Sequence, residues 1–158
     1  MGVVETVEIS NVVASDLQDF VEIYRLAYKG LEEYAYTTTR DIKSYFRWLL
    51  KRDQNGFFKA RIGERVVGFM ACDTRWISHV EGVEVGEIHE IIVHPDFRGL
   101  GIGKRLVEKG IEYSRKQGRR ICELWVGVRN EKAKEFYRSL GFRETDQWGK
   151  WIRMVKRI

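Results

Sequence analysis

Residues 87–103 read EIHEIIVHPDFRGLGIG, and this stretch decides the fold. It predicts an apolar strand, a short turn that ends at Arg98, and a helix opened by Gly99, Gly101 and Gly103. Alternating glycines let the backbone approach a ligand closely, and the start of a helix presents unpaired N–H groups and the positive end of its dipole. The stretch therefore predicts a turn that binds a phosphate or pyrophosphate.

Two common phosphate-binding motifs do not fit this turn. The dinucleotide fingerprint requires G-x-G-x-x-G, whereas these glycines are spaced G-x-G-x-G. A Walker loop requires Ser or Thr after its lysine, whereas Lys104 is followed by Arg105. The pattern that remains is Arg98-x-x-Gly101-x-Gly103.

Composition narrows the class of protein. The chain has 158 residues, 44% of them hydrophobic, so we expect a single domain over residues 1–158 with a real core. No apolar run approaches the roughly 20 residues of a membrane-spanning helix, so we expect no membrane association and a cytoplasmic location. Cys72 and Cys122 lie in strand-like runs, which favours buried free thiols. The net charge of +5 comes without a nucleic-acid recognition motif, and the basic residues of 98–120 suit a small polyanion equally well, so we expect no nucleic-acid partner.

Periodicity, capping residues and turns predict the order of elements. The expected elements are a strand over 5–13, a helix opened by a capping box at Ser15-x-x-Gln18 and ended by Gly30, a helix from Thr38 to before Asn55, strands over 57–62, 65–76 and 83–94, a helix from the glycine turn to Gln117, a strand over 121–128, a helix over 131–140 and a strand over 148–157. Short connections make the three middle strands antiparallel. The unit over 84–128 is a right-handed parallel crossover, which places the glycine turn at the carboxyl end of its strand.

A second motif follows the predicted crossover. Residues 130–142 read NEKAKEFYRSLGF, which fits N-x-x-A followed by (F/Y)-Y-x-x-x-G-F. Together with the RGLGIG turn at 98–103, it resembles the two conserved blocks of the GNAT acyltransferase superfamily, in the same order and separation. The resemblance covers essentially the whole chain. It implies an α/β fold of the α+β type, with a mixed, mostly antiparallel twisted sheet of six to seven strands flanked by about four helices.

The resemblance also implies acetyl-CoA as cosubstrate and no metal. In the family, the strand at 91–93 carries a β-bulge and splays from the strand at 124–126, so that its free backbone groups bind the pantetheine arm. The glycine turn holds the pyrophosphate. The residues implied in coenzyme binding are Ile91, Ile92, Val93, Arg98, Gly99, Leu100, Gly101, Ile102, Gly103, Lys104, Asn130, Ala133 and Tyr137. Asn130 also has the chemistry of a helix N-cap, and both roles can coexist.

Acetyl transfer to an amine requires chemistry that two side chains are placed to supply. A lysine-like ammonium costs about 4 to 5 kcal/mol to deprotonate at pH 7, and the thiolate leaving group needs a proton donor. Tyr137 matches the family's acid, although its position also suits a core aromatic. Glu87 stands where histone-type members carry a glutamate base, acting directly or through water, although a structural carboxylate pair fits equally. In a regular strand, Glu87 and His89 share one face and Glu90 lies on the other, unless a bulge shifts the alternation.

The predicted function is an acetyl-CoA-dependent N-acetyltransferase that acts by direct attack in a ternary complex. Its acceptor is a primary amine of a small molecule, a lysine side chain or a protein N-terminus. The aromatic residues of the first two helices and the following hairpin, Tyr28, Tyr34, Tyr36, Trp48 and Trp76, are candidates for the acceptor pocket. A transferase of longer acyl groups and a coenzyme A-binding regulatory module without turnover stay open, as does a homodimer. His89 and His94 are spaced one residue too far for H-E-x-x-H, so no metal is expected.

Overall fold

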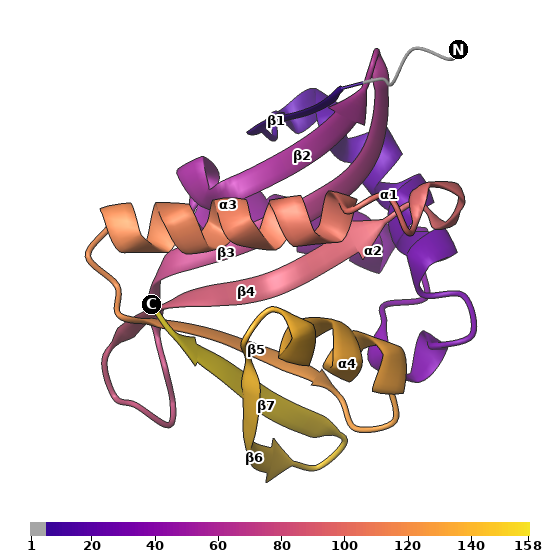
Figure 1. The fold of residues 1–158 in the computed structure, drawn as a ribbon. Helices are drawn as coiled ribbons and strands as arrows, with labels where there is room; N and C mark the ends of the chain where they lie inside the picture. The colour runs from indigo at the N-terminus through magenta and orange to yellow at the C-terminus, as the bar shows by residue number, and fades with distance from the viewer. Residues whose placement is uncertain (1–5) are drawn as a thin grey trace.

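A seven-stranded mixed sheet forms the centre of the molecule, as the computed structural model of residues 6–158 shows (Figure 1). Its strand order is β1-β2-β3-β4-β5-β7-β6. The strands are β1 (Val7–Asn11), β2 (Phe57–Ile62), β3 (Arg65–Ile77), β4 (Glu84–Val93), β5 (Ile121–Gly127), β6 (Arg143–Trp148) and β7 (Trp151–Arg157). Only β4 and β5 are paired in parallel, which confirms the predicted crossover and fold class.

Helices cover both faces of the sheet. They are α1 (Leu17–Ala27), α2 (Thr39–Arg52), α3 (Ile102–Lys116) and α4 (Glu131–Ser139). In Figure 1, α3 and α4 lie in front of the sheet, while α1 and α2 lie behind it. Each face has its own hydrophobic cluster: Leu106 and Val107 of α3 belong to one, and Phe20 and Phe46 of α1 and α2 belong to the other. The sheet therefore separates two cores, as expected for a layered fold.

The helix ends follow the predicted chemistry at α2 but not at α1. The Thr38 hydroxyl accepts a hydrogen bond from the Asp41 N–H at 3.1 Å and so caps α2 as predicted. The predicted capping box at Ser15 is wrong: Asp16, held by Lys59 at 2.8 Å, instead accepts the Val13 N–H, and α1 begins one residue later. Gly30 does not end α1, which stops at Ala27. It lies in the following turn with φ +88°.

The end of the chain also differs from the prediction. The predicted strand over 148–157 is confirmed over Trp151–Arg157 as β7, but a hairpin turning at Gly149 joins it to β6, a strand that was not predicted. All residues of β6 are exposed and the strand lies at the sheet edge. Without a buried face, its sequence RETDQW has no alternation of apolar and polar residues to reveal a strand.

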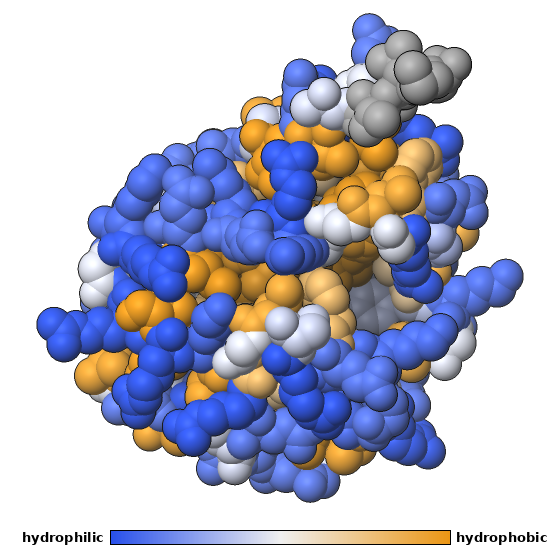
Figure 2. Space-filling model, in the orientation of Figure 1, coloured by the Kyte–Doolittle hydropathy of each residue, from blue (hydrophilic) through white to orange (hydrophobic). Residues whose placement is uncertain are grey.

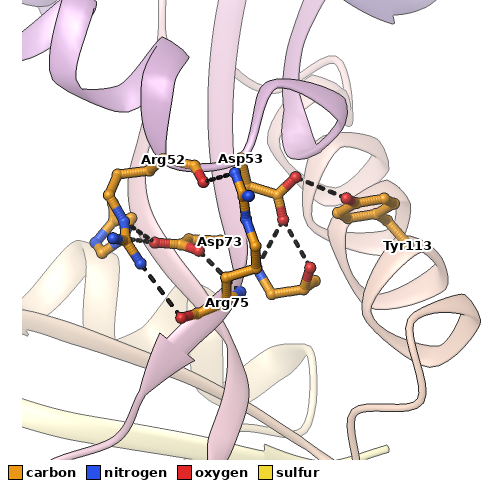
Figure 3. A network of polar contacts seen from close by, with 7 residues as sticks. Arg52, Asp53, Asp73, Arg75 and Tyr113 are labelled. Carbon is orange, nitrogen blue, oxygen red and sulfur yellow. Dashed lines mark hydrogen bonds and ion pairs between the residues drawn. The ribbon is translucent and has the colours of Figure 1, made fainter.

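A polar network joins α2, β3 and α3 at one end of the sheet (Figure 3). Asp53 accepts hydrogen bonds from the Tyr113 hydroxyl at 2.7 Å and from the backbone N–H of Thr74 at 2.9 Å. Asp73 accepts one from Arg52 at 2.7 Å. These bonds fix the end of α2 against β3, the strand that pairs with β4.

Two further expectations concern membrane spans and cysteines. None of the helices within residues 6–158 has the length and apolar character needed to cross a membrane. Cys72 and Cys122 are both buried free thiols, as predicted. Burial raises the pKa of the Cys72 thiol to about 12, so it stays protonated at neutral pH.

Candidate active site

A cleft opens where β4 and β5 separate. The two strands pair from Gly86 with Cys122 to Ile88 with Leu124, and their later residues are not paired with each other. The space between them is a cleft of about 900 Å³, which is also bounded by the start of α3 and by α4. Figure 2 shows the surface hollowed to the right of centre, between hydrophobic side chains above and hydrophilic ones below. Separation of the strands thus leaves backbone groups of β4 free at the cleft wall.

Most of the residues predicted to bind a coenzyme line this cleft. They are Ile91, Ile92, Val93, Arg98, Gly99, Gly101, Ile102, Gly103, Lys104, Asn130, Ala133 and Tyr137. Leu100 is the exception, because it is not among the lining residues and is 62% exposed. The structure therefore brings together two sequence blocks that lie about 30 residues apart in the chain.

The glycine turn has a conformation that requires glycine. Gly99 and Gly101 have φ angles of +80° and +79°, and Gly101 is the N-cap of α3. At Gly103 the reason for glycine is close packing, because a Cβ there would lie 3.1 Å from the ring of Phe136. Lys29, Arg98, Lys104, Arg129 and Lys132 also line the cleft. The unpaired N–H groups of the first turn of α3, together with Arg98 and Lys104 of the same segment, make one end of the cleft an anion-binding site.

The start of α4 positions Tyr137. The Asn130 side chain accepts the Ala133 N–H at 3.3 Å, so the predicted N-cap is confirmed. The ring of Tyr137 packs against Phe136 and Phe142, with centroids 5.2 and 5.9 Å away. Within residues 6–158 its hydroxyl has no hydrogen-bond partner. Burial raises the pKa of Tyr137 well above its ordinary value, so the group keeps its proton.

Glu87 lies outside the cleft. It is 4% exposed and is not among the lining residues of the cleft or of the smaller pocket described below. Burial, followed by the nearby carboxylate of Glu123, raises the pKa of Glu87 well above its ordinary value. Its Oε2 atom has no hydrogen-bond partner in the described part of the chain. Glu123 is itself paired with the buried Arg153. The predicted role of Glu87 as a base stays a prediction.

A β-bulge at His89 changes the direction of the next side chain. Ala71 of β3 pairs with Glu90 and Cys72 pairs with Ile88, so His89 is the extra residue. His89 packs against Trp48 of α2, and Glu90 accepts hydrogen bonds from Tyr28, directly after α1, and from Tyr45 of α2. The regular alternation that placed Glu90 and His89 on opposite faces is therefore wrong, and the bulge predicted within 91–93 lies earlier in β4, at His89.

Glu90 is a site residue that the sequence reasoning missed. Its Oε2 accepts a hydrogen bond from the Tyr28 hydroxyl at 2.6 Å, and its Oε1 accepts one from the Tyr45 hydroxyl at 3.1 Å. The residue lines both the cleft and a second pocket of about 350 Å³. Burial raises its pKa to about 7, although the two tyrosine hydrogen bonds oppose the shift. A single carboxylate within the apolar run IHEIIV was the signal available in the sequence.

The second pocket joins the cleft. The lining residues common to both are Tyr28, Tyr34, His89, Glu90, Trp125 and Trp151. Of the predicted acceptor-pocket aromatics, Tyr28, Tyr34 and Tyr36 line the second pocket, whereas Trp48 and Trp76 contact the His89 ring edge-on. Across residues 6–158, histidine, cysteine and carboxylate side chains form no cluster of three that could hold a metal ion.

Comparison with known proteins assigns the family. A sequence model described as "Acetyltransferase (GNAT) family" matches residues 17–142. The uncharacterized N-acetyltransferase MJ1207 of Methanocaldococcus jannaschii is 53% identical over 157 residues, which cover 99% of this chain and 70% of that protein. The chain belongs to the GNAT acetyltransferase family. It is accordingly an acetyltransferase, as the two motifs predicted.

Solved structures of similar fold agree with the family. PH1933 from Pyrococcus horikoshii OT3 superposes with a TM-score of 0.88 at 35% identity, covering 97% of this chain and 99% of that one. The PaiA N-acetyltransferase from Thermoplasma acidophilum, solved in complex with coenzyme A, gives a TM-score of 0.77 at 23% identity, covering 97% and 99%. The GNAT fold predicted from the sequence is confirmed.

Proposed function

We propose that this enzyme transfers the acetyl group of acetyl-CoA directly to a primary amine in a ternary complex. The acceptor is a small molecule, a lysine side chain or a protein N-terminus. The observation that carries the proposal is the continuity of the two hollows: an anion-binding turn lies at one end, an aromatic pocket at the other, and Tyr137 lines the cleft that joins them. Two substrates can therefore meet without a covalent enzyme intermediate.

The cleft fits coenzyme A by its chemistry. Phosphates suit the backbone N–H groups from Gly101 to Lys104 and the surrounding lysines and arginines. The amide-containing pantetheine arm suits the unpaired edge of β4 at Ile91–Val93, in the manner of an added strand. Coenzyme A in the PaiA N-acetyltransferase, which has the same fold, supports this assignment.

Acetyl-CoA supplies an activated thioester, and the chain supplies positioning and proton transfer. Tyr137 keeps its proton over the physiological pH range and donates it to the departing sulfur. Retention of a protonated tyrosine beside the cleft favours an enzyme over a binding module. The buried position of Glu87 supports a role through water or another side chain rather than direct contact with the amine.

Free thiol release from acetyl-CoA tests the proposal. Wild type is incubated with polyamines, aminoglycosides, amino acids and peptides that carry free N-termini or lysines. Release that depends on the acceptor, and that falls in Tyr137→Phe while coenzyme affinity stays the same, is the expected result. Binding of coenzyme A without release from any acceptor would favour the regulatory module, and release from longer acyl-CoA alone would favour a different acyl group.

A further inference from the structure

We propose that Glu90 binds the ammonium group of the acceptor and takes its proton, which makes the acceptor a cationic primary amine carried on a slender apolar segment. This inference rests on the proposed function, because it names the acceptor class of that same site. Glu90 lies three positions after the predicted base Glu87 in the sequence. Unlike Glu87, it lines both hollows.

Position is the first support for Glu90. Glu90 lines both the cleft and the second pocket, so it lies where the two proposed substrates meet. Tyr137 lines the same cleft from α4. Glu87, three residues earlier on β4, lines neither hollow. The bulge at His89 is what directs Glu90 toward α1 and α2.

The second support is that Glu90 lacks a cationic partner. It is 7% exposed and forms no ion pair with any residue in the described range 6–158. The titratable groups that face it are Tyr24 on α1, Tyr28 directly after α1, Tyr45 on α2, and Tyr137 on α4, and none of them carries a positive charge. The neighbouring His89 is directed to Asp73, at 2.9 Å. A buried carboxylate without a counter-ion is costly, and a bound ammonium offsets that cost.

The charged groups farther out do not replace that counter-ion. Glu33 and Lys150 line the second pocket, but Glu33 pairs with Arg129, and the Lys150 ammonium lies over the rings of Tyr34 and Trp151. Of the cations that line the cleft, Arg129 is taken up by Glu33, and none of the others forms an ion pair with Glu90 in the described part of the chain. The cation that Glu90 can take therefore comes from a ligand.

The pocket wall describes the rest of the acceptor. Its aromatic lining residues are Tyr24, Tyr28, Tyr34, Tyr36, Tyr45, Trp125 and Trp151. Aromatic faces attract ammonium groups and pack well against methylene chains. A volume of about 350 Å³ suits a narrow chain better than a bulky ring system. The pocket thus favours an alkylammonium such as a lysine side chain or an aliphatic amine.

The proton transfer balances with the groups named. An N–H bond of the ammonium breaks and its proton moves to a Glu90 oxygen. The freed lone pair forms the C–N bond with the acetyl carbon as the C–S bond breaks, and the sulfur takes the proton of Tyr137. The nitrogen of the new amide then loses a second proton, which restores the Tyr137 hydroxyl, and Glu90 gives its proton to solvent. One amide, one thiol and one released proton are the products. A carboxyl with a pKa of about 7 is well matched to accept a proton near neutral pH.

Binding of n-butylammonium to the coenzyme A-loaded enzyme tests the proposal without turnover. NMR titration of wild type, Glu90→Gln and the exposed control Glu112→Gln is compared, with n-butanol as the neutral probe. We expect Glu90→Gln to weaken n-butylammonium by at least about tenfold and n-butanol by less than about twofold, with Glu112→Gln unchanged. Wild-type affinity should rise with pH through about 7. Tyr28→Phe should move that midpoint upward, because it removes a hydrogen bond that favours the ionised carboxyl.

Several results would overturn the assignment of Glu90. They are no n-butylammonium binding to wild type, equal binding to wild type and Glu90→Gln, or a midpoint that does not move in Tyr28→Phe. Loss of the pH dependence in Glu87→Gln in place of Glu90→Gln would move the role to Glu87. Glu90-dependent binding combined with no acetyl transfer to any amine would refute the proposed function and leave the ammonium site standing.

Discussion

Without ligand, the free energy of unfolding of Glu90→Gln, taken relative to that of wild type, is expected to be higher at pH 8 than at pH 4. Burial raises the pKa of this carboxyl from an ordinary 4.5 to about 7. The folded protein therefore holds a proton that the unfolded chain releases between these two values, and wild-type stability falls as pH rises through that window. Each pKa unit corresponds to about 1.36 kcal/mol, so the full effect is about 3 kcal/mol. This loss of wild-type stability is complete above pH 7 and absent below pH 4.5.

Urea unfolding of both proteins at several pH values between 4 and 8 provides the assay. Glutamine does not titrate, so the difference between the two free energies of unfolding cancels the contributions of all other groups. That difference should change by about 3 kcal/mol in favour of Glu90→Gln as pH rises. Curves for the two proteins that run parallel over the whole range would refute the claim that Glu90 is a buried carboxyl with a raised pKa.

Substitutions at three further positions test the cleft. Tyr137→Phe should lower kcat by about a hundredfold and leave coenzyme affinity unchanged, as steady-state kinetics and calorimetry can show; an unaltered kcat would remove Tyr137 from proton transfer. Gly101→Ala should cost about 1 kcal/mol in urea unfolding and weaken coenzyme A, because φ is +79° there; equal stability and affinity would contradict the requirement for glycine. Asn130→Ala should lose about 1 kcal/mol through its N-cap, whereas Asn130→Asp should keep most of it; equal losses would argue against the cap.

The parts of the fold that the sequence predicted have strong local patterns. The glycines of the turn at 98–103 and the NEKAKEFYRSLGF block at 130–142 lie where their strand and helix contexts require. The crossover followed from chain handedness, and the free cysteines followed from the strand-like runs around them. These features depend on residues close together in the chain, so one sequence was enough to predict them.

The parts that the sequence did not predict depend on contacts far apart in the chain. Asp16 displaced the predicted capping box because Lys59, 43 residues away, holds its carboxylate. The edge strand β6 has no buried face, so its polar sequence carries no strand pattern. Most important for the site, a one-residue bulge at His89 redirects Glu90 toward Tyr28 and Tyr45. Register shifts of this kind come from pairing with β3 and are not visible in the β4 sequence alone.

Direct transfer to an amine is the central claim, and the fate of a labelled acetyl group tests it most directly. Acetyl-CoA labelled in its acetyl group is incubated with the enzyme, with and without an amine acceptor, and the protein and products are separated by mass. We predict label on the nitrogen of the acceptor, one free thiol for each acetyl group transferred, and none on the protein, because both thiols are buried and the Cys72 thiol keeps its proton. Label that stays on the protein, or thiol release that does not depend on the acceptor, would contradict direct transfer.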